Sequence, residues 1–179
     1  MDLPVFRYHP DPIASGSIVT SDAKCACCGE KRGFIYAAHV YCEDELNDAI
    51  CPWCIADGSA HEKFDASFTD LESLPDNLPT DIAEEIAFRT PGFDTWQSER
   101  WLGCCGDAAA FLEPAGTAEL RARYPKLDGV LMGFIVNDLQ ISGRAAVNLL
   151  ENLHRDSGPT AYVFSCRHCD HQPAYIDLP

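Results

Sequence analysis

The sequence predicts an α+β protein, with an N-terminal zinc-ribbon-like unit joined to a mixed α/β C-terminal part. Three observations predict this architecture. Two Cys-x-x-Cys knuckles, Cys25-Ala-Cys-Cys28 and Cys51-Pro-Trp-Cys54, stand in the first third of the chain, separated by residues 29–50. Strand and helix patterns alternate in the last third. With 46% hydrophobic residues in 179, the chain can also bury a substantial core.

The pattern divides the chain into three parts. Residues 1–71 are predicted to form the zinc-ribbon-like module with an extended N-terminal arm, and residues 72–80 a linker. Residues 81–179 are predicted to form the α/β part, which ends in a Cys knuckle hairpin. The linker prediction depends on Pro75, Pro79 and local acidity.

The N-terminal module is expected to contain one small hairpin. Residues 4–21 carry proline, glycine and aromatic residues without helical periodicity, which predicts the extended arm. Gly33–Tyr36 and Val40–Cys42 predict two short paired strands. Because such a hairpin is too small to bury a core, a metal ion would have to hold it together.

Two helices are expected after the linker. Thr80 is predicted to cap a helix that runs through Phe88, and Thr90-Pro91 has the cap chemistry to begin another. One face of that second helix would carry core or partner-facing side chains, namely Phe93, Trp96, Gln97, Arg100 and Trp101.

The last third is expected to form a crossover. Gly129–Val136 predicts an apolar strand, Ser142 is predicted to cap a helix, and Thr160–Cys166 predicts a second strand. Strand, helix and strand would form a right-handed connection. Ala174–Asp177 predicts a short edge strand beside the second one.

Charge limits the classes of partner. The 13 basic and 28 acidic residues give a formal net charge of −15, which weighs against nucleic acid and favours another protein as partner. No apolar run is long enough for a membrane span, and the N-terminus lacks a signal-peptide pattern. We therefore expect a cytoplasmic protein, in which ten cysteines indicate metal binding or thiol chemistry rather than disulfides.

The first predicted metal site joins the two knuckles. Cys25, Cys28, Cys51 and Cys54 are expected to hold one zinc ion (Zn²⁺) in a closed tetrahedral site, which leaves no position for a substrate. Cys27 and Cys42 are expected to be packed thiols rather than ligands. The alternative for Cys51-Pro-Trp-Cys54 is a redox dithiol, although no β-α-β pattern of the thioredoxin kind precedes it.

A second metal site is a weaker prediction. Its candidate ligands are Cys104, Cys105, Cys166 and Cys169, with His168 and His171 beside them. Adjacent cysteines rarely offer good geometry to one metal, so Cys104-Cys105 is expected to contribute one ligand. The alternative is that these four residues are packed or exposed thiols.

No catalytic residue is predicted. Asp107, Asp138 and His154 could be arranged into acid-base schemes, but their spacing indicates no particular reaction. Helix caps or solvated positions explain these three residues more simply.

Several motifs in order resemble one family. They are Phe6-Arg-Tyr-His-Pro-Asp-Pro12, Cys25-Ala-Cys-Cys-Gly29, Ile50-Cys-Pro-Trp-Cys-Ile-Ala-Asp-Gly58, Trp101-Leu-Gly-Cys-Cys-Gly-Asp107 and Phe164-Ser-Cys-Arg-His-Cys169. Together they resemble the CbrC family of bacterial proteins. The resemblance implies metal binding and an association with colicin tolerance, and it supplies no catalytic residue.

The expected function is therefore a zinc-binding bacterial protein that interacts with another protein or serves a stress or colicin-tolerance response. The alternative is an enzyme, either a thiol oxidoreductase that uses Cys51 and Cys54 or a hydrolase with a pocket that the sequence does not reveal.

Overall fold

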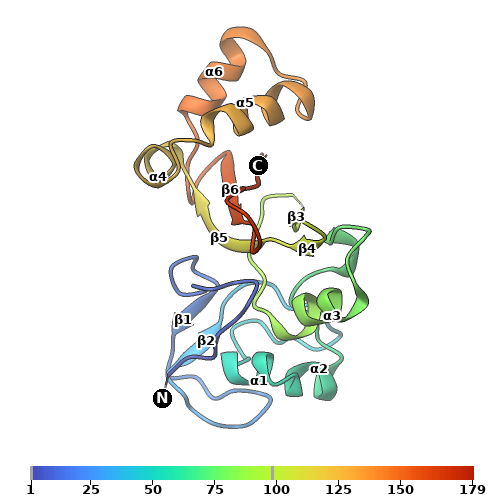
Figure 1. The fold of residues 1–179 in the computed structure, drawn as a ribbon. Helices are drawn as coiled ribbons and strands as arrows, with labels where there is room; N and C mark the ends of the chain where they lie inside the picture. The colour runs from blue at the N-terminus through green and yellow to red at the C-terminus, as the bar shows by residue number, and fades with distance from the viewer. Residues whose placement is uncertain (1, 98) are drawn as a thin grey trace.

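A computed structural model describes residues 2–97 and 99–179. Helices gather at the two ends of the molecule, with the largest sheet between them (Figure 1). The N-terminal part contains β1 (Ile18–Thr20), β2 (Phe34–Tyr36), α1 (Pro52–Ala56), α2 (Ser59–Phe64), a 3₁₀ turn (Leu71–Ser73) and α3 (Thr80–Arg89). The C-terminal part contains β3 (Gly103–Cys104), β4 (Asp107–Ala108), β5 (Ala110–Ala115), α4 (Thr117–Arg123), α5 (Asp128–Asn137), α6 (Gly143–Glu151), β6 (Thr160–Ser165) and β7 (Ala174–Asp177).

All strand pairings of the described residues are antiparallel. β1 pairs with β2, β3 with β4, and β5, β6 and β7 form a three-stranded sheet in that order. The mixed α/β character is confirmed, as is the predicted edge strand, because Ala174 lies opposite Val163 in the register of β7 against β6.

The described residues show no zinc ribbon. The predicted partner of β2 was Val40–Cys42, but β2 pairs with β1 in the register Ile18↔Tyr36. Tyr41 instead makes an isolated bridge with Ser67. The second knuckle opens helix α1 rather than a hairpin, because Pro52 fits the first helical turn, where no backbone N–H is needed.

The N-terminal segment is not a free arm. Phe6, Tyr8 and His9 are buried, and the carbonyl of Tyr8 accepts a 2.8 Å hydrogen bond from the backbone N–H of Phe111 in β5. Phe6 packs in the core around β1 and β2, whereas Tyr8 packs against residues of β5 and β6 from the other half of the chain.

The predicted second helix after Thr90 is wrong. α3 is confirmed, although Pro79 rather than Thr80 precedes its first residue. Beyond α3, no described residue up to Trp101 is helical. Phe93 stacks on Phe111 at 3.9 Å between ring centroids, whereas Trp96 remains 42% exposed. The described residues between α3 and Trp101 form no regular element, so Phe93 and Trp96 do not share one helical face.

The predicted strand Gly129–Val136 is also wrong, and so is the crossover built on it. These residues form most of α5, which lies against both α6 and β7. A continuous apolar run fits a strand or a buried helix equally well, and contacts on two sides explain why this helix is apolar nearly all round. The helix preceded by Ser142 and the strand from Thr160 are confirmed as α6 and β6.

Buried side chains form three clusters. The first joins β1 and β2 to α1 around the cysteines of both N-terminal knuckles. The second is aromatic, with Tyr8, Phe93, Trp101, Phe111 and Phe164, and lies on one face of the three-stranded sheet. The third packs α4, α5 and α6 on β5, β6 and β7. The division into residues 1–71, 72–80 and 81–179 stays a prediction.

Candidate metal centres

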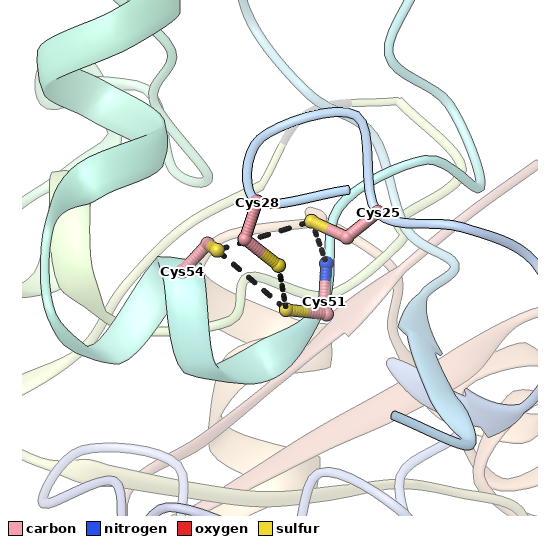
Figure 2. Close-up of side chains that lie close together, drawn as sticks. All are labelled: Cys25, Cys28, Cys51 and Cys54. Atoms are coloured by element: carbon pink, nitrogen blue, oxygen red, sulfur yellow. Dashed lines mark hydrogen bonds between the residues drawn. The ribbon is translucent and has the colours of Figure 1, made fainter. Parts of the chain in front are cut away.

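The four N-terminal knuckle cysteines meet at one point (Figure 2). The Sγ atoms of Cys25 and Cys54 are 3.8 Å apart, those of Cys28 and Cys51 3.9 Å, and those of Cys51 and Cys54 3.6 Å. All four ligand atoms lie within 4.8 Å of one another. We call Cys25, Cys28, Cys51 and Cys54 the first cysteine group.

Two local structures position this group. Cys25 and Cys28 belong to a reverse turn closed by the hydrogen bond from Gly29 N–H to Cys25 C=O, and Gly29 supplies the positive φ of 74°. Cys51 is the N-cap residue of α1, and Cys54 lies in its first turn. The backbone N–H of Cys51 donates to Cys25 Sγ at 3.2 Å, which orients the sulfur for a metal.

The sulfur spacing fits a four-coordinate metal. Four sulfurs held about 2.3 Å from a zinc ion at the corners of a tetrahedron lie about 3.8 Å from one another. The three measured separations of 3.6 to 3.9 Å bracket that value. A disulfide would need about 2.05 Å, and all four cysteines are free thiols. The group can therefore hold a metal ion.

The thiols of the first cysteine group differ in pKa. Burial raises the pKa of Cys51 to about 11 and also raises that of Cys54. Burial acts on Cys25 in the same direction, but backbone hydrogen bonds from Cys28, Cys51 and Cys27 lower its pKa to about 7. Binding of a cation would displace the remaining protons, because thiolates rather than thiols are metal ligands.

The other two N-terminal cysteines lie outside the group. The thiol of Cys27 is 3.5 Å from Ser59 Oγ, and that of Cys42 donates to the carbonyl of Asp44 at 3.0 Å. Both are half-buried against the first core cluster, as expected for packed thiols.

A second group forms from the four C-terminal cysteines. Cys104, Cys105, Cys166 and Cys169 also place their sulfurs within 4.8 Å of one another. The Sγ separations are 3.7 Å for Cys104–Cys105, 3.8 Å for Cys104–Cys169 and 3.7 Å for Cys105–Cys169. These distances again match those around a tetrahedral zinc ion. We call these residues the second cysteine group.

The expectation that Cys104-Cys105 would offer one ligand atom does not fit this geometry. Cys104 pairs with Asp107 across the β3–β4 hairpin, so Cys105 and Gly106 form its two-residue turn. Their φ angles of 55° and 75° are both positive, as a tight turn of the I′ kind requires. The turn brings both adjacent sulfurs toward Cys169, which a regular strand would not do.

Asp107 lies buried behind the second group. Its Oδ2 accepts hydrogen bonds of 2.7 Å from both Arg167 and His168, and its Oδ1 accepts one of 2.8 Å from the phenol of Tyr8. The backbone N–H of His168 donates in turn to Cys166 Sγ at 3.4 Å. Asp107 therefore positions the loop between β6 and β7 that carries two of the four cysteines.

No sequence pattern indicates this network, and the expectation of a helix cap or a solvated position for Asp107 was wrong. Asp107 is instead 7% exposed, and its side-chain partners come from two distant segments, at Tyr8 and at Arg167 and His168. Burial acts to raise the pKa of Asp107, but hydrogen bonds from His168 and Tyr8 outweigh it and hold the pKa below its ordinary value. His171 lies in the same loop, where its carbonyl accepts a 2.9 Å hydrogen bond from the N–H of Cys166.

Thiol pKa values in the second group also diverge. The backbone N–H of His168 and neighbouring thiols lower the pKa of Cys166 to about 6. A hydrogen bond with Cys166 raises the pKa of Cys104 to about 12. As in the first group, the pKa of one thiol is lowered while that of a neighbouring thiol is raised.

A separate cavity of about 300 Å³ lies where Ser15, Phe93, Trp96, Arg155 and Tyr162 meet. At its margin, Ser15 Oγ is 2.7 Å from His9 Nε2, and His9 Nδ1 is 2.7 Å from the carbonyl of Pro91. Burial lowers the pKa of His9 to about 4, so this imidazole is a weak base. The pair fits a buried structural contact better than a hydrolase site.

The two other polar candidates show no catalytic arrangement. Asp138 is the C-cap residue of α5, and His154 is an exposed residue whose backbone N–H donates to the carbonyl of Pro159 at 2.8 Å. In the described part of the chain, no helix has the length and apolar character needed to cross a membrane.

Comparison with known proteins gives a family but no activity. The model of the "Uncharacterised protein family (UPF0167)" matches residues 3–178. UPF0167 proteins of Mycobacterium bovis and Mycobacterium tuberculosis are each 46% identical over 177 residues, which cover 98% of this chain and 94% of theirs. A UPF0167 protein of Pseudomonas aeruginosa is 42% identical over 178 residues, which cover 98% and 96%. No solved structure matches the chain.

These matches correct the family expected from the motifs. The expectation of the CbrC family was wrong, because the matching family model and the relatives at 42% to 46% identity all carry the UPF0167 description. The association with colicin tolerance rested on that resemblance alone and is withdrawn with it.

Proposed function

The chain belongs to the UPF0167 family, and on that premise we propose that it is a protein-binding module built around two structural zinc ions. One ion would be held by each cysteine group. The single observation that carries the proposal is the tetrahedral spacing of the sulfurs, which occurs twice in the same chain.

Zinc is the metal that this donor set favours. Four thiolates select zinc or iron among the common metals, and a closed four-sulfur site is typical of structural zinc. Backbone N–H groups directed at Cys25 and Cys166 stabilise the charged sulfurs in either group. Each site would cross-link segments that hydrophobic burial alone holds weakly, such as the two-residue strands β3 and β4.

A protein partner agrees with the surface. The net charge of −15 opposes binding to nucleic acid, and two valines on α5 and one on α6 are between 39% and 45% exposed: Val130, Val136 and Val147. Failure to bind DNA or RNA at low salt is the expected result, and salt-sensitive binding would contradict this part of the proposal. The cytoplasmic location stays a prediction.

Metal analysis of the reduced protein tests the zinc sites. We expect two zinc ions per chain in the wild type, about one in Cys166→Ser, and about one with an unfolded N-terminal half in Cys51→Ser. Cys42→Ser is the matched control, because Cys42 lies outside both groups, and it should keep two. Unchanged zinc and stability in Cys51→Ser would reject the assigned ligands.

One observation favours thiol redox chemistry as a second candidate. Cys51 is the N-cap of α1, the position that oxidoreductases use to stabilise a thiolate. Burial, however, raises the pKa of this thiol to about 11, and a bound metal would occupy it. Metal-free wild-type protein that reduces a disulfide substrate, and loses that activity in Cys51→Ser, would favour the redox function over the structural one.

A further inference from the structure

We propose that Cys105 and Cys169 are an oxidation site, at which a hydroperoxide forms a disulfide and releases the zinc ion of the second cysteine group. This inference rests on the proposed function, because it needs zinc in both groups. It assigns different roles to two sites that have similar sulfur geometry: the first is a permanent structural site, and the second responds to oxidant.

Exposure is the first observation that separates the two groups. In the first group, Cys25, Cys51 and Cys54 are 1% to 2% exposed, and only Cys28 is an exposed residue. In the second group, Cys105 and Cys169 are both exposed, and Cys104 is half-buried. Cysteine oxidation follows thiolate character and access, so a dissolved oxidant reaches the second group more readily.

The pairing of the exposed thiols is the second observation. Cys105 Sγ and Cys169 Sγ are 3.7 Å apart, so the two most accessible sulfurs of the group are also neighbours. In the first group, by contrast, the one exposed cysteine has a buried thiol as its neighbour, Cys51 at 3.9 Å. Two accessible neighbours are what disulfide formation by a small oxidant requires.

Chain geometry selects this pair over the adjacent one. No described peptide bond is cis, so the Cα atoms of Cys104 and Cys105 are about 3.8 Å apart. Disulfides usually need about 4.4 to 6.8 Å between Cα atoms, so the adjacent pair falls below the range. Cys169 comes from the loop between β6 and β7 and carries no such restriction.

The reaction balances as a two-electron oxidation. The thiolate of Cys169 attacks one peroxide oxygen, so an S–O bond forms, the O–O bond breaks, and hydroxide or alkoxide leaves and takes up a proton. The thiolate of Cys105 then attacks the sulfenic sulfur, the S–O bond breaks, and a second hydroxide is protonated to water. Two thiolates are oxidised and one hydroperoxide is reduced.

Zinc release follows from the loss of ligands. Oxidation leaves Cys104 and Cys166 as the only thiolates of the group, and two sulfurs do not close a tetrahedral site. Because Arg167 and His168 lie between the loop cysteines and bind Asp107, the freed loop would loosen a network that reaches Tyr8 near the N-terminus. A dithiol reductant with added zinc would reverse the change.

The experiment treats the full-length, zinc-loaded protein with hydrogen peroxide. Released zinc is followed with a chromogenic chelator, and disulfides are located by alkylation and peptide mapping. We expect about half of the zinc to leave first, together with a disulfide between Cys105 and Cys169 and with the first group still unmodified. Equal release from both groups, or a disulfide among the first four cysteines, would overturn the inference.

Two variants sharpen the result. In Cys105→Ser, Cys169 should still be oxidised, either to a sulfenic acid that dimedone traps or to a disulfide with half-buried Cys104, whose Sγ lies 3.8 Å away. An unmodified Cys169 in this variant would contradict the inference. Cys42→Ser is the control and should behave as the wild type, because its thiol contacts only the Asp44 carbonyl. If Cys105→Ser fails to fold, the disulfide map of the wild type decides the question alone.

Failure of this inference differs from failure of the proposed function. A zinc content of zero before peroxide is added would reject the proposed function. A content of two with no preferential release would reject only the oxidation site. One zinc ion per chain, located in the first cysteine group, would reject the second zinc site and the oxidation site together.

Discussion

Tyr8 and Asp107 are joined by a 2.8 Å hydrogen bond between two buried side chains that are 99 positions apart. Asp107 lies in β4, directly after the turn that carries Cys105, and binds Arg167 and His168 with its other oxygen. One carboxylate therefore ties the N-terminal segment to both strand connections of the second cysteine group.

Tyr8→Phe should destabilise the zinc-loaded protein by about 2 kcal/mol, because it removes a hydrogen bond to a buried charged group. Urea unfolding followed by fluorescence measures this. Val5→Ala is the nearby control, since Val5 is 94% exposed and its truncation should change stability by less than about 0.5 kcal/mol. Equal stability of Tyr8→Phe and the wild type would show that the contact contributes nothing.

His9 should make stability depend on pH. Burial holds its pKa at about 4, below the ordinary 6.5, so the unfolded chain takes up this proton first. The stability that neutral His9 contributes to the folded protein is fully present above pH 6.5 and is lost as the pH falls toward 4. Acidification from pH 7.5 to 5.5 should therefore lower the free energy of unfolding by about 1 kcal/mol.

The measurement compares the free energy of unfolding of the wild type and of His9→Phe at those two pH values. The effects of metal loss and of other titrating groups then cancel in the difference. We expect the wild type to lose about 1 kcal/mol more than the variant on acidification. The same loss in both proteins would mean that His9 is not a buried neutral residue.

Gly92→Ala should be strongly destabilising. A Cβ at this position would lie 1.9 Å from the carbonyl oxygen of Phe68, so the segment after α3 would have to move away from the first core cluster. A cost of about 3 kcal/mol is expected from overpacking of this kind. Thermal unfolding of the variant measures it, and a melting temperature within experimental error of the wild type would contradict the close approach.

Gly133→Ala should instead stabilise the protein. Gly133 lies within α5, and a Cβ there meets no atom within 4 Å. Alanine is favoured over glycine in a helix interior by about 1 kcal/mol, and urea unfolding should show an increase of that size. A clear loss of stability would argue against the helix.

The errors in the sequence prediction have a common physical cause. The sequence predicts a strand over Gly129–Val136 because these residues are almost all apolar. An apolar run alone does not indicate that α6 and β7 pack on two sides of a helix formed by it. The aromatic residues from Phe93 to Trp101 match a helical period by chance, whereas Phe93 stacks on Phe111 and the indole N–H of Trp96 donates to Thr160 in a non-helical segment. Long-range packing decided both cases.

The cysteine groups were more predictable than the fold around them. Each knuckle is a local structure that short spacing encodes, so Cys25, Cys28, Cys51 and Cys54 could be grouped from their positions alone. The second group needed a turn with two positive φ angles to bring in both Cys104 and Cys105. Asp107 could not be recognised, because Tyr8 and Arg167 reach it only in the folded chain.

X-ray absorption at the zinc edge tests the central claim most directly, because it reports the atoms bound to the metal in the purified, reduced protein. Two four-cysteine sites predict a first shell of four sulfur atoms at about 2.3 Å and no nitrogen or oxygen. A first shell that contains nitrogen or oxygen, or fewer than four sulfurs for each zinc ion, would contradict the assignment of these eight cysteines.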